Sequence, residues 1–330
     1  MAEFYAGMRD GATHTPREGR RSTSQWREGL AAGFRSGHIG VIIFSAGERR
    51  PEIEIMQRLL VAAFALLVLS SAAPRAADEA SLVDVRPGTL PILLTAPHGG
   101  SAEVPGVEPR TIDGRSKPGW TFVITTDLGT DVITEAIAGE IEKITGKKPY
   151  VVIARFDRRF IDANRRPQIA YDGAAAKPVY DHYHRVIRGF VDEIRSRHGQ
   201  GLLIDVHGQS KMRNAMVRGT LNGRTITHLL ARSGAQAMTG PDGLFGQLET
   251  QGFVVFPANG VAIGGTSEDP GFKGGHTVAR YGSHRPDGID AVQLEIGADL
   301  RRRDELHSTG QRVGRAVAAF HAAHLSPPKR

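Results

Sequence analysis

Two short apolar runs in this chain each lead to a histidine that is followed by glycine. The first run covers residues 91–96 and leads to His98, and the second covers residues 201–206 and leads to His207. Apolar runs of this length between turn residues predict buried strands of an α/β sheet. Ligands of such sheets bind beyond the carboxyl ends of the strands. We therefore expect both imidazoles at the functional edge of the sheet.

Strand-like runs alternate with helical patterns along the chain. The strand-like runs lie near 91–96, 150–154, 201–206, 252–256 and 291–295. Apolar residues at a period close to 3.6 predict helices over Asp127 to Ile144, Val179 to Ser196 and about Ser308 to His324. This alternation predicts a three-layer α/β/α sandwich with a mostly parallel central sheet.

Two longer segments, 99–125 and 257–288, are rich in Gly and Pro. Loops of this length are usually functional or disordered. Both should gather at the strand ends near the histidines.

Residues 56–77 have the layout of a secretory signal peptide: a basic start, an apolar core over 59–69 and then small residues. A membrane-spanning helix needs about 20 apolar residues, and this core is shorter. The alternatives are a buried helix or an uncleaved anchor. We expect residues 1–55 to be disordered or to precede the true start, and residues 78–330 to form one catalytic domain. The expected location is periplasmic or secreted, with no membrane span after signal cleavage.

Composition excludes several classes of protein. The chain has no cysteine, so disulfides, thiolate metal sites and cysteine nucleophiles are ruled out, and any metal site must use His, Asp and Glu. The net charge of +7 is spread over scattered basic residues, without a basic stripe that contains aromatic residues. A nucleic-acid partner is therefore not expected.

Two histidines and one carboxylate would make a zinc site with an open position. The sequence leaves three carboxylates as candidates for the third ligand: Asp127, which could also cap a helix, Asp131 and Glu103. Asp205 shares a strand face with His207, so it is a candidate to orient that imidazole.

Other polar residues suggest roles in binding and catalysis. The segment 155–167 contains several arginines and Asn164, and could clamp an anion. Arg280 follows a Gly-Gly pair and could hold a substrate carboxylate. Glu295 lies inside an apolar strand, where burial would raise its pKa towards that of a working general base. A strand-end glutamate paired with Arg301 is the alternative.

Taken in order, these motifs resemble the N-formylglutamate amidohydrolase family, over roughly residues 90–300. The matching segments are Pro-His98-Gly-Gly, Asp127-Leu-Gly, Ile-Asp162-Ala-Asn164-Arg165, Tyr183-His184, Leu-Ile-Asp-Val-His207-Gly, Gly274-Gly275-His276 and Gln293-Leu-Glu295-Ile-Gly. A more distant resemblance is to the zinc carboxypeptidase and aspartoacylase group. The carboxypeptidases place a glutamate three residues after their first histidine, where this chain has Ser101.

The resemblance implies a phosphorylase/hydrolase-like fold and zinc-dependent hydrolysis of an amide bond in an N-acyl amino acid or short peptide. It implies one zinc ion per chain, with His98, Asp127 and His207 as ligands. Asn164 and Arg165 would bind substrate, and Glu295 would be the general base. The alternative function is a non-catalytic, ligand-binding relative of the same fold, which metal content would distinguish.

Overall fold

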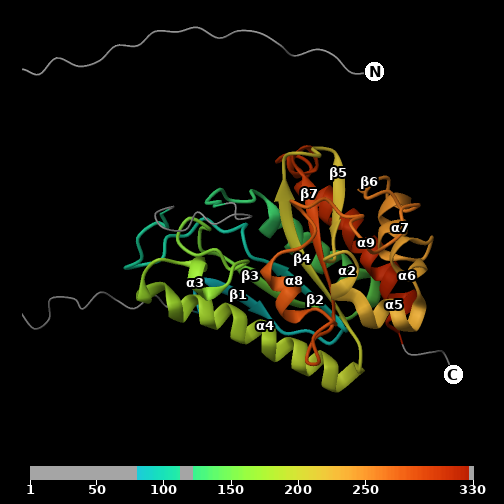
Figure 1. The fold of residues 1–330 in the computed structure, drawn as a ribbon, viewed down its shortest axis with the longest axis horizontal. Helices are drawn as coiled ribbons and strands as arrows, with labels where there is room; N and C mark the ends of the chain where they lie inside the picture. Colours follow the sequence, from blue (N-terminus) through green and yellow to red (C-terminus); the bar gives the residue numbers. More distant parts are fainter. Residues whose placement is uncertain (1–79, 112–121, 327–330) are drawn as a thin grey trace, which may run out of the picture. The chain divides into compact units, whose positions relative to one another are not determined.

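The computed structural model describes residues 80–111 and 122–326 (Figure 1). The segments predicted to be a leading region (1–55) and a signal peptide (56–77) lie outside the described residues, as does part of the 99–125 loop. None of the helices within the described ranges is long and apolar enough to cross a membrane.

The described residues form a seven-stranded sheet in the order β1-β3-β2-β4-β7-β5-β6. The strands are β1 (Val83–Arg86), β2 (Ile92–Ala96), β3 (Tyr150–Ala154), β4 (Leu202–Gln209), β5 (Ala215–Gly219), β6 (Val254–Phe256) and β7 (Asp290–Gly297). Only the β1–β3 and β5–β7 pairs are antiparallel. The mostly parallel sheet predicted from the sequence is therefore confirmed.

Helices cover both faces of this sheet (Figure 1). The longer ones are α2 (Thr130–Thr145), α4 (Lys177–His198) and α9 (Leu306–His324). The shorter ones are α3 (Pro167–Ala170), α5 (Thr227–Ser233), α6 (Gln236–Thr239), α7 (Leu244–Thr250) and α8 (His276–Tyr281). The three long helices agree with the sequence prediction.

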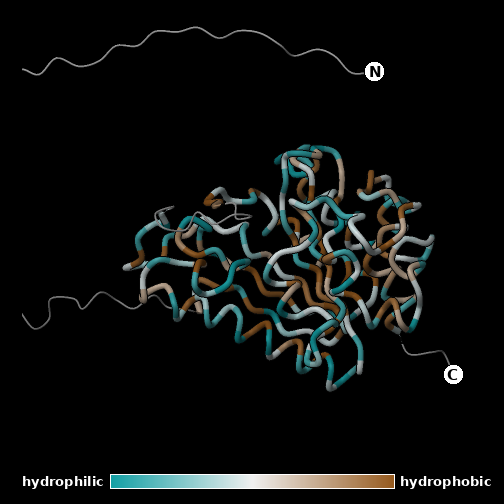
Figure 2. The backbone as a smooth tube through the Cα atoms, viewed as in Figure 1, coloured by the Kyte–Doolittle hydropathy of each residue, from teal (hydrophilic) through white to brown (hydrophobic). Residues whose placement is uncertain are grey.

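Each face of the sheet has its own apolar core because alternate residues of the buried strands point to opposite faces. On β2, Leu94 contributes to the core shared with α2, α7 and α9, whereas Leu93 contributes to the core shared with α4 and α8. Figure 2 shows hydrophobic residues concentrated in the central strands between the helices. The three-layer α/β/α arrangement is thus confirmed.

Two sequence predictions about secondary structure were incomplete. Strands β1 and β5 were missed, because both are short and β5 carries a buried arginine, Arg218, within its apolar run. The sequence predicts a loop over 257–288, but this segment contains α8. A helix of six residues shows too little periodicity to be recognised from sequence.

Candidate active site

Three neighbouring parallel strands place the candidate residues at one edge of the sheet. β2, β4 and β7 lie side by side, and their carboxyl ends point the same way. His98 lies two residues beyond β2, while His207 of β4 is paired directly with Glu295 of β7. His98 and His207, 109 positions apart in the chain, are thereby brought into contact.

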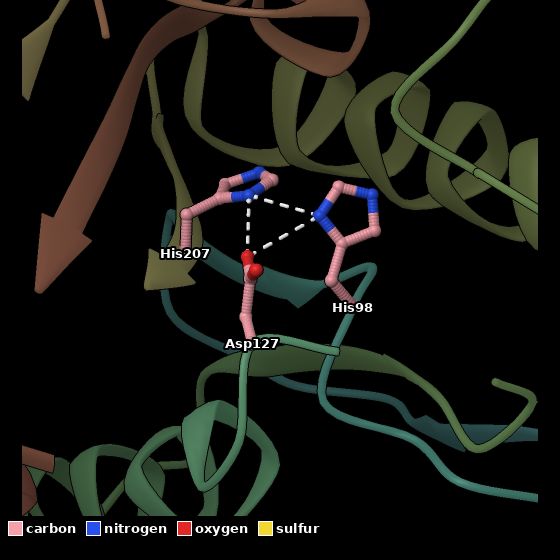
Figure 3. A group of neighbouring side chains, drawn as sticks. All are labelled: His98, Asp127 and His207. Carbon is pink, nitrogen blue, oxygen red and sulfur yellow. Dashed lines mark hydrogen bonds and ion pairs between the residues drawn. The ribbon is translucent and has the colours of Figure 1, made fainter. Parts of the chain in front are cut away.

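The side chains of His98, Asp127 and His207 converge on one point (Figure 3). The two Nδ1 atoms lie 3.2 Å apart, and each is 3.3 Å from Asp127 Oδ2. Ligands bound to zinc at about 2.0–2.1 Å in a tetrahedron lie about 3.3 Å from one another. The triangle therefore has the dimensions of three of the four ligand positions around such an ion.

Each imidazole contacts a carboxylate through its other ring nitrogen. His98 Nε2 lies 2.7 Å from Asp162 Oδ1, and His207 Nε2 lies 2.9 Å from Asp205 Oδ2. An ionised carboxylate only accepts hydrogen bonds, so these contacts favour a proton on Nε2 and direct the Nδ1 lone pair into the triangle. Carboxylates commonly orient metal-binding histidines in this way. The contact of Asp205 with His207 confirms the sequence prediction for Asp205.

The charges around the triangle favour a cation. Although burial by itself lowers the pKa of His207, the nearby carboxylates of Asp205, Asp127 and Glu295 raise it to about 10. Three electron-rich atoms at this spacing repel one another unless a positive charge lies between them. The site can meet this requirement with a proton on His207 or with a metal ion, which competes for the same lone pair.

Of the three carboxylates considered for the third ligand position, Asp127 lies beside the histidines. Its backbone N–H donates to His98 O at 3.0 Å, which fixes the loop before α2 against the end of β2. Asp127 does not cap α2; Gly129 takes that position with a positive φ of 83°. Asp131 instead pairs with Arg155 at 3.3 Å, and Glu103 is exposed.

Glu295 is buried next to the triangle. Its burial and the charge of Asp127 raise the pKa of this carboxyl to about 7, although His207 and a hydrogen bond from Gln293 oppose the shift. Gln293 Nε2 donates to Glu295 Oε1 at 2.8 Å and so holds the carboxylate in place. A carboxyl with a pKa near neutrality can both take up and release a proton under physiological conditions. The alternative pairing of Glu295 with Arg301 is not what the structure has, because Arg301 donates to backbone carbonyls.

The two residues predicted to bind substrate from the Asp-x-Asn-Arg segment differ in how much of their side chain is available. Asn164 is buried: its Oδ1 accepts from the backbone N–H of Thr277 at 2.8 Å, and its Nδ2 donates to Gln293 Oε1 at 3.3 Å. This amide is already occupied by protein partners. Arg165 is partly exposed, with Nη1 donating to the carbonyl of Asn164 at 3.1 Å.

Arg280 lies further along the chain, on α8, and is exposed. Its guanidinium lies over the ring of Tyr281, 5.6 Å from the ring centroid. Burial chiefly lowers the pKa of His276, and the charge of Arg280 lowers it further, to about 4. The structure thus places Arg280 beside His276 and Tyr281 rather than in contact with the three converging side chains.

Sequence reasoning missed the individual importance of Arg158. Its Nε and Nη2 donate to Asp162 Oδ2 at 3.0 and 2.9 Å, and its Nη1 lies 3.6 Å from Asp127 Oδ1. Arg110 and Arg165 also lie 3.9 Å from Asp162. No local sequence signal singles out Arg158, because residues 158–162 form a turn followed by irregular backbone rather than a helix. Several cations thus surround one buried carboxylate beside the triangle.

A mostly parallel α/β sheet thus carries at its carboxyl edge a buried glutamate and a His-Asp-His cluster that could hold a metal ion. Residues 174–301, which include His207 and Glu295, match the model of the N-formylglutamate amidohydrolase family. The resemblance found in the motifs is therefore confirmed over this range, and it supports an enzyme that hydrolyses an amide bond.

Comparisons with individual proteins give weaker similarities. No curated protein matches the chain. Among solved structures, N-formylglutamate amidohydrolase from Ralstonia eutropha JMP134 is 16% identical with a TM-score of 0.47, covering 73% of this chain and 96% of that one. A gene product from Agrobacterium tumefaciens is 19% identical with a TM-score of 0.49, covering 74% and 97%. A bacteriophage poly-gamma-glutamate hydrolase is 12% identical with a TM-score of 0.33, covering 78% and 95%. Similarities of this size do not define a function.

Proposed function

We propose that this protein is a zinc-dependent amidohydrolase that cleaves the amide bond of an N-acyl amino acid or short peptide. The observation that carries the proposal is the convergence of His98 Nδ1, His207 Nδ1 and Asp127 Oδ2 at separations of 3.2–3.3 Å. The donor set, two imidazoles and one carboxylate, suits zinc. Without cysteine in the chain, no thiolate competes for this role.

A zinc ion held there would lower the pKa of a bound water and polarise the substrate carbonyl. Glu295 takes a proton from the attacking water and later returns it to the leaving amine, a role that suits its pKa of about 7. Arg165 stabilises the negative charge that develops on the carbonyl oxygen. We retain Arg280 as the proposed anchor for a substrate carboxylate, because its exposed guanidinium has capacity for a further anion.

We further propose that the protein is exported to the periplasm or secreted, on the basis of the layout of residues 56–77. An N-terminal fusion of residues 56–77 to a reporter that is active only outside the cytoplasm tests this. A reporter that remains inactive, while a fusion to a known export signal is active, would exclude export by this segment.

Metal analysis followed by a hydrolysis screen tests the proposed function. The purified protein should contain about one zinc ion per chain and should cleave members of a panel of N-acyl amino acids and dipeptides. A chelator should abolish the activity, and added zinc should restore it. Stoichiometric zinc without any turnover, or a protein that binds no zinc, would favour a non-catalytic binding relative.

A further inference from the structure

Arg301 lies behind the candidate site, where three separate chain segments meet. It ends the short 3₁₀ turn Ala298–Arg301, which follows β7. Its guanidinium donates to three backbone carbonyls: Nη1 to Leu128 at 2.6 Å, Nε to Ile296 at 3.0 Å and Nη2 to Gln209 at 3.5 Å. From the sequence alone, this arginine is a candidate only as a partner for Glu295.

The three accepting carbonyls share one property. Leu128 directly follows Asp127, Ile296 directly follows Glu295, and Gln209 lies two residues after His207. Each carbonyl therefore belongs to a segment that carries one proposed ligand or the proposed base. The segments come from the loop before α2, from β4 and from β7, so only a long side chain with several donors can join them.

Gly208 makes room for this arrangement. A Cβ atom at Gly208 would lie 2.4 Å from the Cζ atom of Arg301, so the guanidinium passes directly over this glycine. The backbone N–H of Gly208 also donates to Asp127 Oδ2 at 3.1 Å. Gly208 thus contacts the third proposed ligand on one side and the arginine on the other.

The guanidinium is also held electrostatically. Burial lowers the pKa of the Arg301 guanidinium, and the negative charges of Asp127 and Glu295 offset part of this effect. A neutral side chain of similar size would keep the packing but lose both the hydrogen bonds and this attraction. The neighbouring Arg302 differs: it is exposed and pairs with Asp304 at 3.2 Å.

We infer that Arg301 is a positioning residue, which holds the segments carrying Asp127, His207 and Glu295 at the spacing that the proposed metal site and base require. Among the described residues, its guanidinium makes no hydrogen bond to a proposed ligand side chain or to Glu295. It acts through the backbone of the residues that follow them. The expected effect of Arg301 on metal binding rests on the proposed function. The hydrogen bonds by which Arg301 joins the three segments do not depend on it.

Arg301→Met and Arg302→Met form a matched pair of variants for the test. The first readout is peptide-level hydrogen exchange of the metal-free protein, comparing segments 126–133 and 207–212 with a segment within α4. Arg301→Met should accelerate exchange in both site segments and leave α4 unchanged, and Arg302→Met should behave as the wild type. Unchanged exchange in both site segments would overturn the inference, whatever the metal content.

The second readout is zinc affinity, measured by competition with a chromophoric chelator, together with the visible spectrum of the cobalt-substituted protein. Loss of a group that orients ligands typically weakens metal binding by about 10- to 100-fold. Arg301→Met should show a loss of this size and an altered cobalt spectrum. Arg301→Lys should recover part of the affinity. A variant with lower thermal stability but wild-type affinity and spectrum would mean that Arg301 is merely structural.

Gly208→Ala provides a second route if Arg301→Met does not fold. Its added methyl group should displace the guanidinium and reproduce the exchange pattern expected of Arg301→Met. A wild-type exchange pattern in this variant would count against the inference. A wild-type protein that binds no zinc would overturn the proposed function, and the hydrogen-exchange result would still decide whether Arg301 connects the segments.

Discussion

At the scale of single residues, the candidate site depends on the carboxylates that flank its histidines. Asp205 and Asp162 are buried and contact the outer nitrogens of His207 and His98. They favour one tautomer of each ring and direct the two Nδ1 atoms towards Asp127. Thr95 in turn donates to Asp205 Oδ1 at 2.6 Å, so the orientation of His207 is set from within the sheet.

Asp205→Asn should weaken zinc binding by about 10- to 100-fold, because the amide is a poorer acceptor for the Nε2 proton of His207. Competition with a chromophoric chelator measures the change. Asp304→Asn, at an exposed position, is the matched control and should bind zinc as the wild type does. Equal affinities in the two variants would show that Asp205 does not support His207 as a ligand.

Glu295→Gln should retain zinc and lose turnover, since an amide of the same shape cannot accept the proton of the attacking water. The expected loss in kcat is about 10²- to 10⁴-fold, the usual contribution of a general base. Zinc content and steady-state kinetics on the best substrate of the screen measure both properties. Glu249→Gln on the exposed end of α7 is the control. Retained zinc with a near-normal rate would remove Glu295 from the mechanism.

At the scale of the elements, α2 and α9 pack unusually closely on one face of the sheet. A Cβ atom at Gly310 of α9 would lie 2.5 Å from Ala136 Cβ and 2.8 Å from the carbonyl oxygen of Ile133. Gly314, one turn later, has similar contacts with Glu140 and Ile137. Because α2 begins at Thr130, shortly after Asp127, this packing also restrains the segment that carries Asp127.

Gly310→Ala should therefore destabilise the protein by about 1–3 kcal/mol, the usual cost of overpacking a rigid contact. Gly139→Ala in α2 is the matched control, because nothing lies within 4 Å of a Cβ there. That variant should be more stable by about 0.4–1 kcal/mol, since alanine restricts the unfolded chain. Urea unfolding measures both changes. A neutral or stabilising effect of Gly310→Ala would mean that the helices can separate at little cost.

At the scale of the whole molecule, a buried neutral histidine links the stability of the fold to pH. His184 of α4 lies 3.0 Å from the hydroxyl of Tyr281 and 3.0 Å from the carbonyl oxygen of Ala163. Burial, together with the charges of His276 and Arg280, lowers the pKa of His184 to about 3. Between pH 6.5 and about 3 the unfolded chain binds a proton at this position that the folded chain does not. Stability is therefore lost as the pH falls through this range.

His184→Gln should lower the slope of the free energy of unfolding against pH between 6.5 and 4, because the positive contribution of His184 is removed. The difference in slope should approach about 1.4 kcal/mol per pH unit, which corresponds to one proton. Glu295, whose pKa is raised to about 7, contributes a slope of opposite sign, but it does so equally in both proteins. Urea unfolding at a series of pH values measures the slopes, with the exposed His307→Gln as control. Parallel pH profiles for wild type and His184→Gln would contradict the prediction.

The sequence by itself determined the strands and helices with strong patterns. The buried strands β2, β3, β4 and β7 were recognisable because burial on both faces demands continuous apolar residues. The long helices showed a 3.6-residue period because each packs one side against the sheet. The same runs placed His98 and His207 near the carboxyl ends of two strands and Glu295 within a third.

Only the tertiary structure decided which groups meet. Asp127, Asp131 and Glu103 were all candidates from the residues alone, and only the family resemblance favoured Asp127. The structure places Asp127 Oδ2 3.3 Å from the Nδ1 atoms of both histidines. Arg158 and Arg301 were inconspicuous among many arginines until the fold placed one beside Asp162 and the other across three carbonyls. The physical reason is the distance along the chain over which each effect acts. A local pattern of apolar residues reflects only which positions are buried. Hydrogen bonds between distant segments depend on how the whole sheet packs with its helices.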